Sequence, residues 1–592
     1  MKLFLSAPIE LLNKKLNISV CFLLVFLLSN VSDAQVTLEK EVEITDKALY
    51  FDGKKVNGVV PDSGTGYDYR YGREINPHGD CIKAYREYVF MTWYRGGKSD
   101  RHMMLTRYNM ETGSMKTIEF PHQHTGLNGN WWIGETHNTI AVGISPKDES
   151  IHLVFDMHAY GNSGNFVNDY FRYSYSVKDA ATVTDDEFTL DLFVKDPLDG
   201  DYRHTTMDGV RDAPHYTKYT YPQFFLNDDG ELFLTMRKGT SHDGAQAFIK
   251  YDDTQSRWGR FKFVNALGAQ SKGETHDWSI YGAVKYTGGK IRIGFQRRLR
   301  NGQDKYIYQN GVYYAYSDDP TGASLWKTPS GDPMTFPLVK AEEVLVIEPG
   351  DYVETTQRNM VHIVGGFDFA VTDNGDEHIV SYVQDKQNNK SKRLHTYRKA
   401  GTTDFVTEEY SAGSELYVAG PDVYVIGLKN GRVNIVKAEG GTNDFMEVYQ
   451  HADGPSFDKG VVHVNNGKLY YYLKEAGGSG DQRTTHLQVY DLDIPEEYIK
   501  KEEEEVVLAN NDRLSELSIY PNPTRGDFVV DLNGLKGSKV MIYNINGARV
   551  FEKEISNTLT NFVEGNLVQP GLYFVKVLKD DGTLVTKKLL VE

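Results

Sequence analysis

Short stretches in which apolar and polar residues alternate recur along the chain, and they come in pairs separated by turn residues. In each pair, an apolar and aromatic run of four to seven residues precedes Gly, Asp or Asn, and a second such run follows. A period of two interrupted by such turns is typical of β-hairpins. Seven are predicted, with runs at 88–94, at 139–144 and 151–155, at 223–226 and 232–236, at 281–286 and 290–295, at 367–371 and 378–383, at 423–428 and 433–437, and at 461–464 and 468–473.

The spacing of these hairpins indicates how they are arranged. Three start-to-start spacings are 51–58 residues, the last is 38, and two near 85 leave room for added strands or loops. A repeat of about 40–50 residues with four short strands is typical of a propeller blade, whereas a β-helix, with a repeat of about 20–30 residues, fits worse. We therefore predict an all-β protein whose main domain, residues 35–495, is a seven-bladed β-propeller.

The N-terminus has the pattern of an export signal. Three lysines, at positions 2, 14 and 15, precede an apolar run at 18–28, and small residues stand at 32 and 34. The run is too short to span a bilayer of about 30 Å as a helix, so residues 1–34 are predicted to be a cleaved secretory signal rather than a membrane anchor. Cleavage would leave Cys81 as the one cysteine of the mature chain.

The C-terminus is predicted to be a separate module. A charged stretch begins at 496 and indicates an acidic linker over 496–514. Residues 515–592 then show alternating runs at 528–532, 539–544, 549–555 and 572–578, which predict a small β-sandwich. Tyr-Pro-Asn-Pro at 520–523, Gly526 and the stretches 540–547 and 571–577 resemble the C-terminal sorting domain of type IX secretion substrates. The resemblance implies export across the outer membrane of a Gram-negative bacterium, to the cell surface or the medium, with the type IX machinery as partner.

Composition narrows the function classes. The chain has 592 residues, which by length alone would suggest about four domains, but a propeller is one closed unit. Its 55 Gly and 39 Tyr suit turns and strands, and its net charge of −17 disfavours nucleic acid as a partner. With two cysteines, neither a disulfide framework nor a thiolate-rich zinc site is available.

Candidate catalytic residues flank two of the predicted hairpins. His137 and His158 lie at the outer ends of one hairpin, and antiparallel pairing would make them neighbours. Tyr221 and Arg237 repeat this arrangement on the next hairpin. No HExxH, GxSxG, Walker or EF-hand motif accompanies them.

This residue set favours β-elimination of a uronate. Glycoside hydrolysis normally uses two carboxylates. In an elimination, an arginine can neutralise the substrate carboxylate while His or Tyr side chains move protons to and from the sugar.

Several stretches also resemble a known family. These are residues 101–109, 118–122, 132–146 with Gly-Glu-Thr-His-Asn, and 152–160. They are similar to the BNR-4 propeller family and, more narrowly, to the ulvan lyases of polysaccharide lyase family 25, over the chain up to about residue 490. The resemblance implies a seven-bladed propeller that cleaves ulvan, a sulfated rhamnose–uronic acid polymer, and leaves unsaturated uronate ends.

The resemblance also assigns roles to residues. His137 and Tyr221 are the expected base and acid pair, in an order that it leaves open, with Arg237 as neutraliser and His158 in support. Tyr281 is expected on the substrate side, and Asn138 and Arg298 are added as substrate-binding candidates. The family implies no cofactor for the chemistry, but a structural Ca or Zn ion can be present; Cys81, His78, Asp80 and His276 are loose candidates for it.

An anionic substrate requires a basic cleft in this acidic chain. Nine basic residues are expected near the rim: Arg95, Lys98, Arg101, Arg107, Arg237, Lys238, Arg297, Arg298 and Arg300. The alternatives are a non-catalytic glycan-binding propeller and a sialidase-like hydrolase, for which only one degenerate Asp-box stretch, 317–326, is found. The chain is expected to be a monomer. Uronate preference, endo or exo mode, and the fate of the tail stay open.

Overall fold

The protein is described from a computed structural model that covers residues 36–158, 171–197, 199–208, 215–300, 310–355, 361–362, 366–499, 518–520, 524, 528–531, 537–545, 547–554, 570–579 and 584–591. The predicted signal and almost all of the predicted linker lie outside these residues. The chain divides into two compact units, Met1–Ile499 and Lys500–Glu592. No helix in the described residues is long and apolar enough to cross a membrane.

The first three sheets of the large unit follow one another along the chain. The first contains β3 (Ile82–Tyr85), β4 (Tyr88–Tyr94), β5 (His102–Asn109) and β6 (Met115–Gln123). The second contains β8 (Ile140–Ile144), β9 (Ile151–Phe155) and β10 (Tyr173–Tyr175). The third contains β11 (Tyr219–Leu226), β12 (Leu232–Gly239) and β13 (Gly244–Asp252), with the short β14 (Arg257–Trp258) and β15 (Lys262–Phe263).

The next three sheets repeat the plan. The fourth contains β16 (Trp278–Thr287), β17 (Lys290–Leu299), β18 (Asn310–Ser317), β19 (Trp326–Lys327) and β20 (Leu345–Ile347); one parallel residue pair links it to the third. The fifth contains β21 (Val361–His362), β22 (Asp368–Val371), β23 (Glu377–Asp385), β24 (Lys390–Arg398) and β25 (Val406–Glu409). The sixth contains β26 (Tyr417–Ala419), β27 (Asp422–Lys429), β28 (Arg432–Glu439) and β29 (Met446–Gln450).

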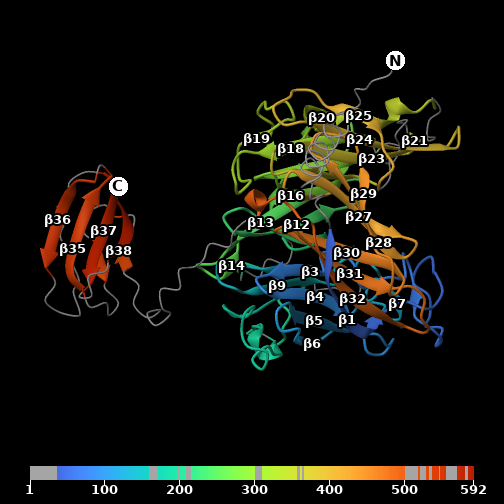
Figure 1. Ribbon diagram of the computed structural model, residues 1–592, viewed down its shortest axis with the longest axis horizontal. Helices are drawn as coiled ribbons and strands as arrows, with labels where there is room; N and C mark the ends of the chain where they lie inside the picture. Colours follow the sequence, from blue (N-terminus) through green and yellow to red (C-terminus); the bar gives the residue numbers. More distant parts are fainter. Residues whose placement is uncertain are drawn as a thin grey trace, which may run out of the picture. The chain divides into compact units, whose positions relative to one another are not determined.

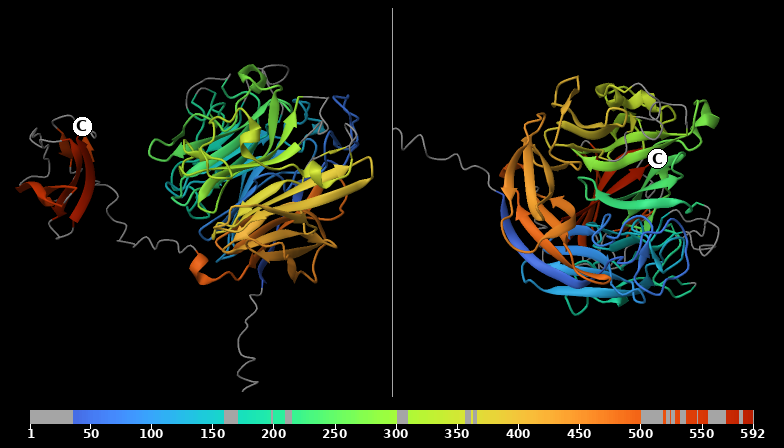
Figure 2. Two further views of the ribbon diagram at one scale, coloured as in Figure 1. Left: turned by 90° about the horizontal axis from the view of Figure 1, so that it is seen from above. Right: turned by 90° about the vertical axis from the view of Figure 1, so that its right-hand side faces the viewer.

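The seventh sheet joins the two ends of the unit. It contains β30 (Phe457–Asn465), β31 (Lys468–Glu475) and β32 (Gln482–Asp491), and its outer strand is β1 (Thr37–Leu49), which pairs antiparallel with β32. The sheets follow one another around a centre, from blue through green and yellow to orange, and β1 lies beside the orange strands (Figure 1; Figure 2, right). The prediction of a seven-bladed propeller is confirmed, with one predicted hairpin in each of the seven sheets.

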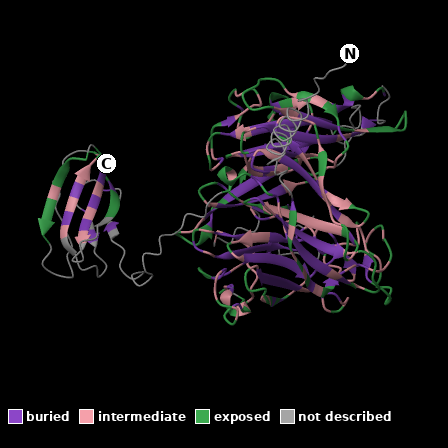
Figure 3. Ribbon diagram, in the orientation of Figure 1, coloured by how far each residue is buried: buried purple, intermediate pink, exposed green. Residues whose placement is uncertain are grey.

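The core lies between neighbouring sheets. Phe90 and Leu105 of the first sheet share one buried cluster with Val142 and Leu153 of the second. Burial is concentrated along the strands, and the connecting loops are exposed (Figure 3). Each blade therefore stabilises the next by burying apolar surface against it.

Short elements connect the blades. A two-stranded parallel ladder joins β2 (Asp68–Tyr69) to β7 (Ile133–Gly134), the strand just before the predicted catalytic loop. The described 3₁₀ helices are η2 (Leu190–Leu192), η3 (Ala269–Lys272), η4 (Ala341–Val344), η5 (Pro349–Tyr352) and η6 (Glu496–Tyr498). Tyr498 of η6 packs on the cluster between the sixth and seventh sheets, so the first residues after 495 belong to the large unit.

The C-terminal unit is a small β-sandwich, as predicted. One sheet pairs β33 (Ser518–Tyr520) with β34 (Val529–Asp531). The other has the order β36 (Arg549–Glu554), β35 (Gly537–Asn544), β37 (Gly571–Lys579) and β38 (Leu584–Val591). Ile519 and Val530 of the first sheet share one buried cluster with Val540 and Val575 of the second.

Candidate active site

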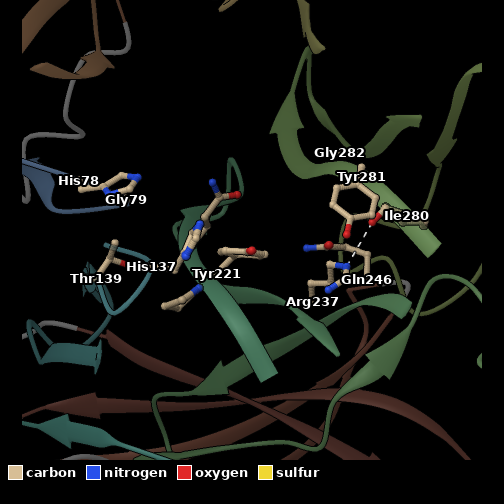
Figure 4. A pocket seen from close by; sticks show the side chains of 12 residues that line it. His78, Gly79, His137, Thr139, Tyr221, Arg237, Gln246, Ile280, Tyr281 and Gly282 are labelled. Atoms are coloured by element: carbon tan, nitrogen blue, oxygen red, sulfur yellow. Dashed lines mark hydrogen bonds between the residues drawn. The ribbon is translucent and has the colours of Figure 1, made fainter. Parts of the chain in front are cut away.

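A cavity of about 280 Å³ opens where the inner strands of the first four sheets begin. Its wall is built from the loops before β3 and β8, from β11, and from the facing parts of β12, β13 and β16. The lining residues are His78, Gly79, His137, Thr139, Tyr221, Pro222, Gln223, Arg237, Gln246, Ile280, Tyr281 and Gly282 (Figure 4). The site is therefore shared between four sheets, and no single hairpin contains it.

The two predicted histidines lie side by side. Ile140 pairs with Phe155 at the end of the β8–β9 hairpin, which brings His137, three residues before β8, beside His158, three residues after β9. The centroids of the two imidazole rings are 4.2 Å apart. Antiparallel pairing brings the two residues to the same end of the hairpin.

Tyr221 approaches both histidines from the next sheet. Its ring centroid lies 5.8 Å from that of His137 and 5.9 Å from that of His158. The residue has φ 58°, and the β11–β12 register shifts between Thr220 and Gln223, so a bulge turns the Tyr221 side chain into the cavity. Burial raises the pKa of the Tyr221 phenol, and the charge of Arg237 opposes that rise.

Arg237 lies on the other side of Tyr221 from His137 (Figure 4). Its guanidinium donates hydrogen bonds to the Ile280 carbonyl at 3.3 Å, to Ser279 Oγ at 2.6 Å and to the Thr240 carbonyl. Within the described part of the chain it forms no ion pair with a carboxylate, and burial lowers its pKa from the usual range of arginine. An arginine held by neutral oxygens is suited to receive an anion.

Tyr281 lies between two guanidinium groups. The guanidinium carbon of Arg237 lies 5.0 Å from the centroid of the Tyr281 ring, and the guanidinium carbon of Arg298 lies 3.9 Å from the same centroid. Arg298 Nη1 also donates to the Tyr281 hydroxyl at 2.7 Å. The predicted substrate-side residues Tyr281 and Arg298 therefore form one unit with the predicted neutraliser.

Asn138 is placed differently. Its side chain is buried and donates to the Gly126 carbonyl at 3.3 Å, so it holds the loop before β8 and is not among the lining residues. Its assignment as a substrate-binding residue has no support from this geometry, because the amide points into the loop.

Two described residues that contact both histidines were not singled out from the sequence. Glu135, buried between the histidines, accepts from His137 Nδ1 at 2.7 Å and from His158 Nδ1 at 3.1 Å. Tyr71, 46% exposed, places its ring 4.7 Å from that of His137 and 5.7 Å from that of His158. The sequence contained one indication for Glu135, its position two residues before His137. It contained none for Tyr71, because Tyr71 lies in a loop outside every predicted hairpin.

Metal-binding geometry is confined to one trio in the described residues. Ligand atoms of Glu135, His137 and His158 lie within 4.8 Å of one another. The loose candidates named from the sequence do not form such a group: Asp80, for example, is bound by Lys83 and by the Phe224 amide. A structural Ca or Zn ion stays a prediction.

The predicted basic rim is only partly available to a ligand. Within the part of the chain that the structure describes, five of the rim's nine residues form ion pairs with carboxylates: Arg95, Lys98, Arg107, Arg297 and Arg300. Of the basic residues that the structure describes, Arg237 lines the cavity, and Arg298 contacts the ring of the lining residue Tyr281. Local positive charge is therefore concentrated on one wall.

Comparisons with known proteins agree on the family. Residues 88–412 match the model of the BNR repeat-containing family, and residues 518–592 match that of the secretion system C-terminal sorting domain. A short-isoform ulvan lyase from Alteromonas sp. (strain LOR) is 46% identical over 494 residues, which cover 80% of this chain and 93% of the relative. A long-isoform ulvan lyase from Pseudoalteromonas sp. (strain PLSV) is 47% identical over 478 residues, 78% of this chain and 48% of the relative.

One solved structure is also similar. The crystal structure of polysaccharide lyase Uly1 superimposes with a TM-score of 0.74 at 53% identity, covering 77% of this chain and 99% of that one. The chain spans about half the length of the long-isoform relatives that it matches.

Proposed function

Because the chain belongs to the BNR repeat-containing family, alongside the ulvan lyases to which it is similar, we propose that it is itself an ulvan lyase. It cleaves the bond between sulfated rhamnose and uronic acid by β-elimination. The observation that carries this proposal is the convergence of His137, Tyr221 and Arg237 in one cavity, with the His158 ring packed beside those of His137 and Tyr221.

The arrangement suits each step of the elimination. Arg237, with His158 in support, neutralises the uronate carboxylate, which makes the C5 proton more acidic. His137 and Tyr221 form the base and acid pair: one removes the C5 proton, and the C–H electrons are delocalised into the neutralised carboxylate. As these electrons form the C4–C5 double bond, the C4–O bond breaks, and the departing oxygen takes a proton from the other member of the pair.

The cavity disfavours glycoside hydrolysis. That reaction normally needs two carboxylates beside the scissile bond. Among the described residues that line the cavity, none is Asp or Glu. Of the carboxylates that the structure describes, the one in contact with these two histidines is that of Glu135, which is buried and hydrogen-bonded to both rings.

The C-terminal unit, a secretion system sorting domain, supports an extracellular site of action. We propose that it directs the enzyme through the type IX machinery across the outer membrane, so that the propeller meets its polymeric substrate outside the cell. A reporter protein fused to residues 515–592 tests this: it should appear at the surface or in the medium of a type IX host, and retention in the periplasm would contradict it.

Incubation with purified ulvan tests the activity. Elimination creates an unsaturated uronate, so ultraviolet absorbance should rise as the polymer shortens. New reducing ends without that absorbance would indicate a hydrolase, and retention on ulvan without cleavage would indicate a binding module.

Arg237→Ala should reduce turnover by about 10²- to 10³-fold, as expected for loss of a charge-stabilising group. The thermal unfolding midpoint and the circular dichroism spectrum report whether the fold is kept. Arg300→Ala is the matched control, because Arg300 is exposed and paired with Asp277 outside the cavity lining. Near-normal turnover of Arg237→Ala would rule out its role as neutraliser.

A further inference from the structure

Both histidines of the site depend on the same carboxylate. Glu135 Oε1 accepts from His137 Nδ1 at 2.7 Å and from the His137 backbone amide at 3.0 Å. Glu135 Oε2 accepts from His158 Nδ1 at 3.1 Å. The Glu135 side chain is 2% exposed, so water does not compete for these oxygens.

The backbone of Glu135 is held as firmly as its side chain. The residue directly follows β7, which pairs with β2 in a parallel ladder. Its carbonyl accepts from the Asn138 amide at 3.1 Å and from His124 Nε2 at 3.0 Å. The carboxylate therefore has little freedom to move away from either histidine.

Each carboxylate oxygen of Glu135 faces the Nδ1 atom of one imidazole, and this geometry decides which nitrogen of each ring carries the proton. Burial by itself would raise the pKa of this carboxyl, but the hydrogen bonds from His137 and His158 outweigh it and lower the pKa to about 2. An ionised carboxylate only accepts hydrogen bonds, so both Nδ1 atoms must carry a proton. In a neutral imidazole this leaves the lone pair on Nε2.

We propose that Glu135 is a positioning residue that holds His137 and His158 together through their Nδ1 atoms, so that Nε2 is the nitrogen of each ring that can exchange a proton. The neutral ring of His137 can then act as a base at Nε2, and the imidazolium form of either ring can donate from Nε2, as the acid or in support of Arg237. The inference rests on the proposed lyase function. It adds a residue that touches neither the sugar nor the reacting atoms.

The variant Glu135→Gln tests this clamp, the pair of hydrogen bonds that Glu135 accepts from His137 and His158, with little change in the shape of the side chain. The amide oxygen can accept from one histidine, but the NH₂ group facing the other cannot, so one imidazole must change tautomer or lose its partner. On ulvan, kcat should fall by about 10²-fold or more with KM changed by less than about threefold. The pH–rate profile should also change, because the group that faces both imidazoles has lost its negative charge.

Two further variants calibrate this result. Glu135→Asp keeps the charge but is one methylene shorter, so it should retain more activity than Glu135→Gln. Glu475→Gln is the matched control: it removes a carboxylate bonded to His486 at 2.6 Å in the seventh sheet and should leave kcat and the pH profile unchanged. A purely structural role would lower the unfolding midpoint without moving the pH profile, and that result would overturn the proposal.

A spectroscopic measurement on the unmodified enzyme does not depend on any variant at position 135 folding. With ¹⁵N-labelled histidine, two-bond ¹H–¹⁵N spectra identify the tautomer of each ring, and His137→Gln and His158→Gln assign the two signals. Both neutral rings should be protonated at Nδ1. Protonation at Nε2 in either ring would overturn the proposal.

Metal binding at the same trio is tested directly. Zn²⁺ added to the EDTA-dialysed wild-type enzyme should leave the ¹⁵N signals of His137 and His158 unchanged, and displacement of both signals by the metal would show that Glu135 and the two histidines hold a metal instead. A wild-type enzyme that gives no ultraviolet product would refute the proposed function itself. An active wild type with a fully active Glu135→Gln would refute only the clamp.

Discussion

At the scale of single residues, the site contains a tyrosine, Tyr221, whose backbone is held in an unusual conformation. Tyr221 has φ 58°, a region that is rarely occupied by bulky side chains and costs about 1–3 kcal/mol. The β11 bulge imposes this conformation and aims the phenol at the histidines. The identities of His137, His158, Tyr221 and Arg237 could be predicted because the hairpins place them. The strained backbone at Tyr221 could not be predicted, because no residue type in this stretch of sequence indicates a positive φ.

Tyr71 leads to a prediction at this scale. Its ring borders both histidines but stays 46% exposed, so it can contact a bound sugar. Tyr71→Ala should raise KM for ulvan by about 2- to 10-fold, which corresponds to the 0.5–1.5 kcal/mol of an aromatic contact, with a smaller effect on kcat.

Initial rates over a range of ulvan concentrations measure this, with Tyr352→Ala as the control. Tyr352 is similarly exposed, at 37%, and lies in η5, outside the cavity lining. Unchanged KM in Tyr71→Ala would show that this side chain does not meet the substrate.

At the scale of elements, paired strands are joined to their neighbours by buried polar networks. In the fifth sheet, His378 Nε2 accepts from the Gly441 amide at 3.0 Å, so its Nδ1 donates to His395 Nε2 at 2.9 Å. His395 Nδ1 in turn donates to Asn443 Oδ1 at 2.8 Å. This series of hydrogen bonds requires both imidazole rings to be neutral. It links β23 and β24 to the turn after β28.

This network predicts loss of stability in acid. Burial, with a further contribution from His395, lowers the pKa of His378 to about 3, and burial lowers that of His395 to about 4. Both values lie below the 6.5 of an unperturbed histidine, so unfolding takes up protons. The network contributes fully above about pH 6.5, and its contribution is lost as the pH falls from 6.5 toward 4.

Thermal unfolding midpoints between pH 4 and 7.5 check this. The double variant His378→Gln/His395→Gln should show a weaker dependence on pH over that interval than the wild type. Parallel curves for the two proteins would show that this pair does not couple stability to pH.

At the scale of the whole molecule, the ring is closed by a strand from the other end of the chain. β1 pairs with β32 from Thr37 to Leu49, and Ile44 and Leu49 are buried there. Burial of each such side chain is worth about 1.5–3 kcal/mol. Closure also covers the edge of β32, which would otherwise be free to pair with another chain.

Removal of residues 36–49 should therefore lower the unfolding midpoint and promote association, because an uncovered strand edge recruits other strands. Differential scanning calorimetry and size-exclusion chromatography measure both effects. A chain ending at residue 499 is the control, and its propeller should unfold as in the full chain, because residues 500–592 form a separate compact unit. A β1-deleted protein with unchanged midpoint and size would contradict the role of this strand.

The sequence by itself determined the class of fold, the number of blades and the identity of the main candidate catalytic residues. Those features depend on local signals: alternation with a period of two, turn residues, and side chains at fixed distances from a hairpin. The tertiary structure alone decided that Tyr71 and Glu135 join the histidines, that Asn138 turns inward, and that β1 closes the ring. These outcomes depend on contacts between segments far apart in the chain, or on the direction of one side chain, and neither leaves a periodic trace in the sequence.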